Sequence, residues 1–152
     1  MKKLVDPFVP FIGSWRGTNS LWLSPDASAQ KSATTLTLAP AIEGKFLEIK
    51  YTWIYDDQPQ EGLLLIGYEA ELVTAIWADS WHMGKKFMQC QGVIKENGSV
   101  DVRGQYQAPP GPDWGWRIVL EHEGENTLNL TMYNITPEGQ EALAVEAVYS
   151  RN

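Results

Sequence analysis

Residues 77 to 82 gather more chemically useful side chains than any other stretch of the chain: Trp77-Ala78-Asp79-Ser80-Trp81-His82. A carboxylate, a hydroxyl and an imidazole stand beside two indoles. Asp79 or His82 could orient the polar end of a ligand while the indoles cover its apolar part, because ligand pockets combine apolar walls with a few polar groups. Alternatively, Trp77 belongs to the core, Asp79 caps the backbone of a turn, and His82 is solvated.

Other reactive residues have less support as sites. Ser80 and His82 lie in one segment without a nucleophile elbow, which argues against a hydrolytic triad. The run Glu121-His122-Glu123 looks like a metal cluster, but successive residues of a strand point to opposite faces. Cys90 has no basic neighbour in sequence and is typical of a small buried hydrophobe. We therefore expect no catalytic residue, no metal and no cofactor, which favours a binding protein over an enzyme.

Two further segments supply aromatic candidates. Residues 47–55 alternate apolar and polar side chains, and a buried tyrosine hydroxyl there needs a partner. Residues 108–114 form a proline-rich loop, which is either a lid that folds Trp114 over a pocket or an ordered loop with that ring packed on a rim. The candidate ligand-binding residues are Tyr51, Trp53, Trp77, Asp79, Trp81, His82, Trp114 and Trp116.

The elements that must position these residues are strands. Segments rich in β-branched and aromatic residues, separated by turn residues, predict ten of them, and no long 3.6-residue apolar period predicts a helix. Their approximate ranges are 14–23, 32–39, 45–55, 61–68, 72–79, 87–96, 99–107, 115–123, 126–134 and 141–150.

The connections alternate in length along the chain. Short ones are expected at 40–44, 69–71, 97–98 and 124–125, with Asn97-Gly98 as a type I′ hairpin turn. Longer ones are expected at 24–31, 56–60, 80–86, 108–114 and 135–140. Alternate loops of an up-and-down meander lie at opposite ends, so the pattern predicts a closed base with short turns and a mouth with long loops.

The two chain ends are expected to meet at the base. Trp15 heads the first strand and Arg151 ends the last, so the guanidinium can stack on the indole. The stretch from Leu4 to Ile12 is apolar but interrupted by Pro7 and Pro10, which predicts that residues 1–13 form a plug or short helical turn. A sheet closed in this way has no exposed edges, and about ten strands leave room for one small ligand.

Composition limits the class of protein. A chain of 152 residues with 43% hydrophobic residues fits one domain, residues 1–152, with a single core. A net charge of −7 without a basic stripe argues against nucleic acid and against an anionic membrane as partners. Met1-Lys2-Lys3 could begin a signal peptide, but Asp6, Pro7 and Pro10 interrupt the apolar run that should follow. We expect a cytoplasmic protein.

Two groups of residues at the chain ends resemble a known superfamily. Gly13-Ser14-Trp15 and Tyr149-Ser150-Arg151 resemble the calycins, which include lipocalins, fatty-acid-binding proteins and nitrobindin-like haem barrels. The chain is more closely similar to a bacterial calycin-like family of unknown function. The matching pieces are residues 44–48 (GKFLE), 61–68 (EGLLLIGY), 77–80 (WADS) and 132–133 (MY). The resemblance implies an antiparallel calycin-like barrel. Nitrobindin-like members ligate haem through a histidine late in the chain, and residues 126–151 contain none.

Three functions remain open at this point. The first is lipocalin-like binding of a small hydrophobic or amphipathic molecule in the barrel. The second is a haem-binding or enzymatic nitrobindin-like barrel, which would need His82 or His122 to face inward. The third is a barrel filled by its own aromatic side chains that serves as a structural module, for example in a homodimer.

Overall fold

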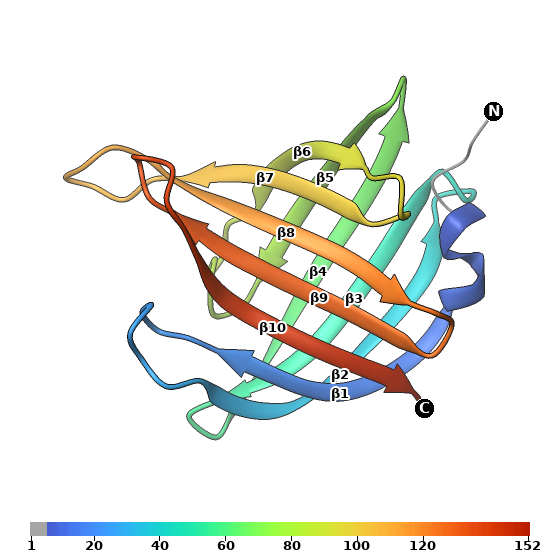
Figure 1. Ribbon diagram of the computed structural model, residues 1–152, viewed down its shortest axis with the longest axis horizontal. Coiled ribbons are helices and arrows are strands. Elements are labelled where there is room, and N and C mark those ends of the chain that lie inside the picture. Colours follow the sequence, from blue (N-terminus) through green and yellow to red (C-terminus); the bar gives the residue numbers. More distant parts are fainter. Residues whose placement is uncertain (1–5) are drawn as a thin grey trace.

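The computed structural model describes residues 6–152 as an all-β chain, closed into a barrel of ten antiparallel strands (Figure 1). The strands follow one another around the barrel in chain order, and β1 closes the sheet by pairing with β10. The predicted up-and-down barrel of about ten strands is therefore confirmed. The strands are β1 (Gly13–Leu21), β2 (Gln30–Ala41), β3 (Phe46–Tyr55), β4 (Gln58–Glu69), β5 (Leu72–Asp79), β6 (Met88–Ile94), β7 (Val100–Tyr106), β8 (Trp114–Glu123), β9 (Thr127–Ile135) and β10 (Glu141–Arg151).

Side chains alternate between core and solvent along the strands, as a half-buried antiparallel sheet requires. In β3, Leu47, Ile49 and Trp53 are buried, whereas Lys50 and Thr52 are exposed. The buried faces of all ten strands form one continuous hydrophobic core inside the barrel. Among the described residues, no helix has the length and apolar character needed to cross a membrane.

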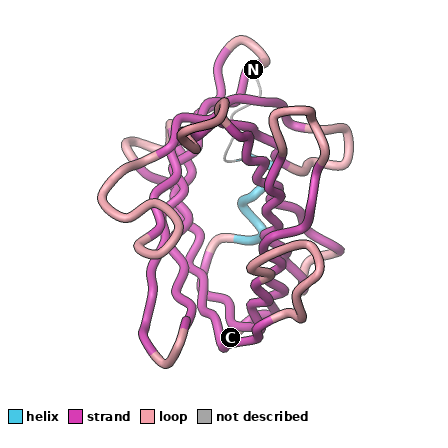
Figure 2. The backbone as a smooth tube through the Cα atoms, turned by 90° about the vertical axis from the view of Figure 1, so that its left-hand side faces the viewer, coloured by secondary structure: helices cyan, strands magenta, loops and turns pink. Residues whose placement is uncertain are grey.

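A short 3-10 helix, η1 (Asp6–Phe11), precedes β1 and plugs one end of the barrel. Phe8 and Phe11 from this helix are buried in the core. In Figure 2 the strands form an oval ring, and η1 is visible through its opening. The predicted N-terminal plug is thus confirmed from Asp6 onward, while its residues 1–5, including the signal-like Met1-Lys2-Lys3, lie outside the described residues.

The chain ends meet at this plugged base, as expected from the sequence. Trp15 is paired with Arg151 in the β1–β10 ladder, and the Arg151 guanidinium lies 4.6 Å from the centre of the Trp15 ring. The buried Trp15 indole donates to the carbonyl of Phe11 at 2.9 Å. Arg151 also donates to the carbonyls of Pro10 and Glu125. Strand ends, plug and one base turn are therefore held by a single side-chain cluster.

Alternate connections lie at opposite ends of the barrel, but their lengths differ from the expectation at two places. The predicted long loop at residues 56–60 is wrong: Asp56 and Asp57 form a two-residue turn, both with positive φ, and β4 begins at Gln58. The predicted type I′ turn at Asn97-Gly98 is also wrong. Only Gly98 of that pair has positive φ, and the Asn97 side chain instead accepts from Ser99.

The tight turn at residues 56–57 has a similar pair of positive φ angles to the connections at residues 42–43 and 70–71, so none of these three turns relies on glycine for both positions. Aspartate tolerates the left-handed region better than most residues, so an Asp-Asp pair can replace the usual Asn-Gly. An asparagine that bonds the backbone two residues on forms a different, wider turn. The mouth therefore carries four long loops, at residues 22–29, 80–87, 107–113 and 136–140, together with the tight turn at 56–57.

Candidate functional site

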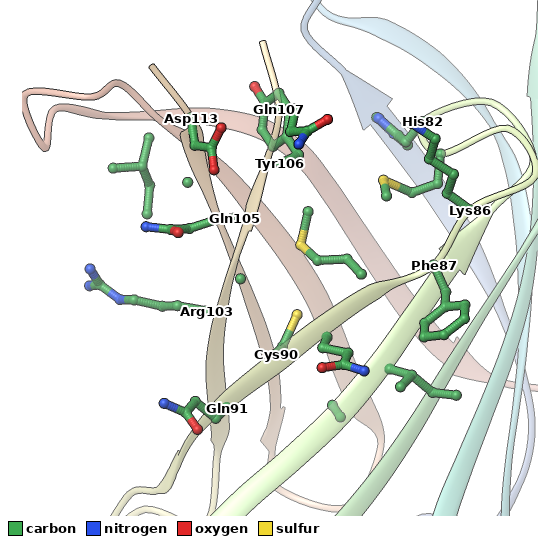
Figure 3. A pocket seen from close by; sticks show the side chains of 18 of the residues that line it. His82, Lys86, Phe87, Cys90, Gln91, Arg103, Gln105, Tyr106, Gln107 and Asp113 are labelled. Carbon is green, nitrogen blue, oxygen red and sulfur yellow. The ribbon is translucent and has the colours of Figure 1, made fainter.

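The sheet is incompletely paired between β6 and β7 at the mouth. Their ladder runs only from Ile94 paired with Val100 to Gln91 paired with Arg103. Beyond this point the two strands diverge, as Figure 3 shows above Gln91 and Arg103. β6 keeps its partner β5 on the other side as far as Met88. The barrel wall consequently has a gap that opens toward the long loops.

A cleft of about 1500 Å³ occupies this gap. Its lining comes from both faces of the sheet. Met88, Cys90 and Tyr106 contribute from the barrel interior, and Gln89, Gln91 and Gln105 contribute from the outer face (Figure 3). His82 and Met83 from the 80–87 loop complete the mouth side. The cleft is thus bordered by side chains from both faces of the wall, and its interior members Met88 and Cys90 are themselves buried.

A second, enclosed cavity lies deeper in the barrel and measures about 10 Å³. That volume is about what one water molecule needs. Polar and apolar side chains line it together: Asn19, Tyr51, Trp53, Asp79, His82, Leu130, Met132, Val145, Ala147 and Tyr149. Tyr149, on β10, which is separated from β3 by β1 and β2, shares a hydrogen bond of 2.9 Å with Thr34 of β2. The cavity thus has a polar lining at the centre of an apolar core.

Asp79 is the hub of this polar lining. The residue ends β5 and is only 3% exposed. Its Oδ2 accepts the Tyr51 hydroxyl at 2.7 Å and the Trp53 indole N–H at 3.2 Å, while Oδ1 accepts the backbone N–H groups of Trp81 and His82, both at 2.9 Å. One oxygen therefore caps the turn and the other faces the barrel, so both sequence interpretations of Asp79 describe part of its environment.

Tyr51 is placed by a glycine on the neighbouring strand. Gly62 pairs with Tyr51 in the β3–β4 ladder, and a Cβ at Gly62 would lie 1.9 Å from the Tyr51 ring. The missing side chain lets the phenol lie flat across the strand. There its hydroxyl donates to Asp79 and accepts from the Trp77 indole N–H at 2.9 Å. A Trp77–Tyr51–Asp79 chain of hydrogen bonds results.

Burial and the Asp79 charge set the protonation of this group. Burial, reinforced by the nearby Asp79 carboxylate, raises the pKa of Tyr51 well above its usual value. Burial also lowers the pKa of His82, and the attraction of Asp79 offsets only part of this effect. Among the described residues, Asp79 is the sole charged side chain in the buried set. The upper barrel therefore combines a neutral phenol, a neutral imidazole and one buried acid.

Four indoles surround the His82 imidazole and form what we call the aromatic cage: Trp53, Trp77, Trp81 and Trp116. Their ring centres lie 5.5, 5.6, 4.7 and 5.4 Å from that of His82. Trp77 and Trp116 are stacked on each other at 5.3 Å with nearly parallel planes. The cage wall touches the acid directly, because Trp53 donates to Asp79. His82 lines both the cleft and the enclosed cavity.

Seven of the eight predicted site residues come together in this region. Tyr51, Trp53, Asp79 and His82 line the enclosed cavity, and Trp77, Trp81 and Trp116 contact them through the bonds and ring contacts above. Trp114 stands apart. It is half-buried at the first position of β8, opposite Tyr106, and lines neither hollow within residues 6–152. Whether these residues bind a ligand remains a prediction.

Sequence reasoning missed the side of the cavity opposite the cage. Asn19, Met132 and Tyr149 line it from β1, β9 and β10. Strand parity could have placed each of them inside the barrel, because Asn19, Met132 and Tyr149 share their strand faces with the buried Trp15, Leu130 and Ala147, respectively. No local pattern marked them as polar-site residues. The gap between β6 and β7 had no signal in the sequence at all.

The remaining reactive residues lie away from the cage. His122 packs at the base, where its ring stacks on Phe11 at 4.3 Å. The Ser80 hydroxyl donates to Gln60 on the exposed rim. Cys90 is buried, and burial raises the pKa of its thiol to about 11. These placements assign structural contacts to all three residues.

Comparisons with known proteins identify a family and a fold. A family model described as "Protein of unknown function (DUF1579)" matches residues 8–151. A solved structure, "Crystal Structure of Rv2717c from M. tuberculosis", is similar with a TM-score of 0.68 and 12% sequence identity, covering 100% of this chain and 99% of that one. At this identity the likeness concerns the fold alone. The comparison with curated proteins gives no match. The predicted membership of a family of unknown function is confirmed, and the wider calycin assignment stays a prediction.

Proposed function

The chain belongs to the DUF1579 family, whose members have no assigned function, and we propose from its geometry that the barrel binds one small hydrophobic or amphipathic molecule through its mouth. In this proposal the molecule enters by the cleft between β6 and β7, in the manner of a lipocalin ligand. We further propose that this takes place in the cytoplasm.

One observation carries the proposal: the His82 side chain lines both the open cleft and the enclosed polar cavity. A molecule in the cleft is therefore one side chain away from the Asp79 carboxylate. In this proposal the ligand passes the apolar side chains of Met83, Met88 and Tyr106, which line the cleft, and reaches the aromatic cage, whose Trp116 contacts Tyr106. An apolar wall that leads to a few fixed polar groups is the usual design of a small-molecule site.

The enclosed cavity is too small for such a molecule by itself. Drug-sized ligands occupy pockets of roughly 300–1,000 Å³, against about 10 Å³ here. The apolar body of the ligand would therefore occupy the inner part of the cleft. Its polar end would reach toward Asp79 and Tyr51 once the intervening side chain moves.

The seven tryptophans allow a site-resolved test. Each indole N–H gives its own NMR signal, and neutral 1-decanol serves as the probe. We expect the signals of Trp53, Trp77 and Trp116 to shift with a single saturable isotherm, while those of Trp15 at the base and Trp22 in the 22–29 loop stay in place. Shifts confined to Trp15 or Trp22, or no saturable shift at all, would refute binding in the cleft. Native mass spectrometry of freshly purified protein would then identify any molecule that the barrel carries from the cell.

A further inference from the structure

We propose that the preferred ligand carries an organic cation, such as an alkylammonium head, and that this head takes the place of the His82 imidazole inside the aromatic cage. The inference rests on the proposed function, because it names the ligand class for the same site. It also assigns His82 a role as the side chain that fills the cage until the ligand arrives.

The cage has the form that recognises weakly hydrated cations. Four indole rings surround one position, with ring centres 4.7 to 5.6 Å from the imidazole centre. A cation within about 6 Å of an indole face is attracted by its quadrupole, and tryptophan is the strongest of the aromatic residues in this respect. A quaternary or tertiary ammonium group placed at the imidazole position would thus lie within this distance of four indole centres, with the Trp53 ring stacked on that position.

The charge around the cage has the matching sign. Asp79 is buried against the cage wall, and no lysine or arginine belongs to the buried set of residues 6–152. The lowered pKa of His82 leaves that ring uncharged near neutral pH. A carboxylate or phosphate head at the imidazole position would therefore meet a buried negative charge, whereas the bases Lys86 and Arg103 belong to the exposed part of the cleft lining. A cationic head would meet an acid that no buried lysine or arginine neutralises.

His82 can leave the cage without unfolding its loop. Its backbone N–H is held by Asp79 Oδ1, and the N–H of Met83 is held by the Asp79 carbonyl at 2.9 Å. The main chain is thus fixed, while the imidazole contributes only ring contacts to the cage. The same side chain already borders the cleft beside Lys86 (Figure 3), so rotation about its Cα–Cβ bond moves the ring toward solvent.

An unsatisfied donor supports a ligand at this position. Trp116 is 6% exposed, and its indole N–H has no partner among the described residues. A buried N–H of this kind is rare and costly in a native protein. Because the Trp116 ring contacts His82, a ligand that replaces the imidazole could present an oxygen acceptor to this N–H. The expected ligand is therefore a cation with a nearby hydroxyl, ether or carbonyl oxygen.

The test compares three probes with one tail and different heads: decyltrimethylammonium, 1-decanol and decanoate. Binding is measured by titration of the tryptophan fluorescence, below the micelle concentration of the two ionic probes and below the solubility limit of 1-decanol. We expect the cation to bind about tenfold more tightly than either of the others, in line with cation–aromatic attraction in a partly dry site. If the neutral or anionic probe binds as tightly as the cation, the inference is overturned while the proposed binding function stands. If none of the three binds, both fail.

Two variants separate the cage from the tail-binding cleft, and both alter side chains whose rings make no described hydrogen bond. His82→Ala empties the cage before the ligand arrives, so the cation no longer has to displace the ring contacts of the imidazole. The affinity for decyltrimethylammonium should therefore rise about two- to tenfold. Trp116→Phe should lower the affinity for decyltrimethylammonium about three- to tenfold and the affinity for 1-decanol much less. Trp22→Phe removes an indole outside the cage and should change neither of these two affinities. An unchanged cation affinity in both His82→Ala and Trp116→Phe would refute the placement of the head.

Discussion

Replacing Asp79 by asparagine tests the polar hub of the barrel most directly. The carboxylate accepts four hydrogen bonds, two at each oxygen, from Tyr51, Trp53 and the backbone of Trp81 and His82. An asparagine amide accepts at one oxygen only, and its NH₂ group would face two donors whichever way it turns. Each buried donor left unsatisfied costs about 1–3 kcal/mol, so the free energy of unfolding should fall by about 2–6 kcal/mol. The lower end applies if the Tyr51 hydroxyl rotates to accept from the amide.

Urea unfolding, followed by tryptophan fluorescence and far-UV circular dichroism, measures this loss. The matched control is Asp113→Asn, which makes the same change of charge at an exposed position of the 107–113 loop and should alter stability by less than about 0.5 kcal/mol. Tyr51→Phe and the double variant complete a cycle, with an expected coupling of about 0.5–3 kcal/mol between the two side chains. A loss below about 1 kcal/mol in Asp79→Asn, or no coupling to Tyr51, would show that the hydrogen-bonded hub is not a major source of stability.

Three further outcomes are expected. Gly62→Ala should destabilise the barrel strongly, because its Cβ would lie 1.9 Å from the Tyr51 ring. A Cβ at Gly111 would make only an ordinary contact with the Ala108 carbonyl oxygen at 3.8 Å, so Gly111→Ala should be nearly neutral, and equal melting temperatures would contradict this packing. The folded-state pKa of His82 lies below the ordinary 6.5, so the folded protein binds fewer protons at this side chain than the unfolded chain does. The free energy of unfolding should therefore decline as the pH falls below 6.5. In urea unfolding measured at several pH values, His82→Gln should flatten this part of the stability curve. With a thiol pKa of about 11, Cys90 should react with Ellman's reagent at pH 8 only after unfolding; rapid labelling of the native protein would contradict its burial.

Local patterns were sufficient for the strands and for the base. The alternation around Tyr51 and the turn residues between segments predicted all ten strands to within a few residues at each end. Trp15 and Arg151 could be paired from strand parity and strand number alone. Two turns were mispredicted because Asp56-Asp57 adopts positive φ without glycine, and because the Asn97 side chain bonds its own backbone.

The candidate site was partly visible in the same patterns. The motif at Trp77–His82 and the alternate aromatics of the third strand lie where they were expected. Trp114 lies at the first position of β8, opposite Tyr106, so it stays apart from the other seven candidates and its role remains a prediction. Asn19 and Tyr149 escaped notice because each is an isolated polar residue on an otherwise apolar strand face.

The sequence by itself determined the closed meander and its two locked ends, because these depend on a period of two, on turn chemistry and on strand number, all of which are properties of neighbouring residues. Only the tertiary structure decided that four indoles from three separate segments surround one imidazole, and that β6 and β7 diverge beside it. Those features depend on register and side-chain rotation across the barrel. Such long-range packing leaves no periodic trace in a single chain.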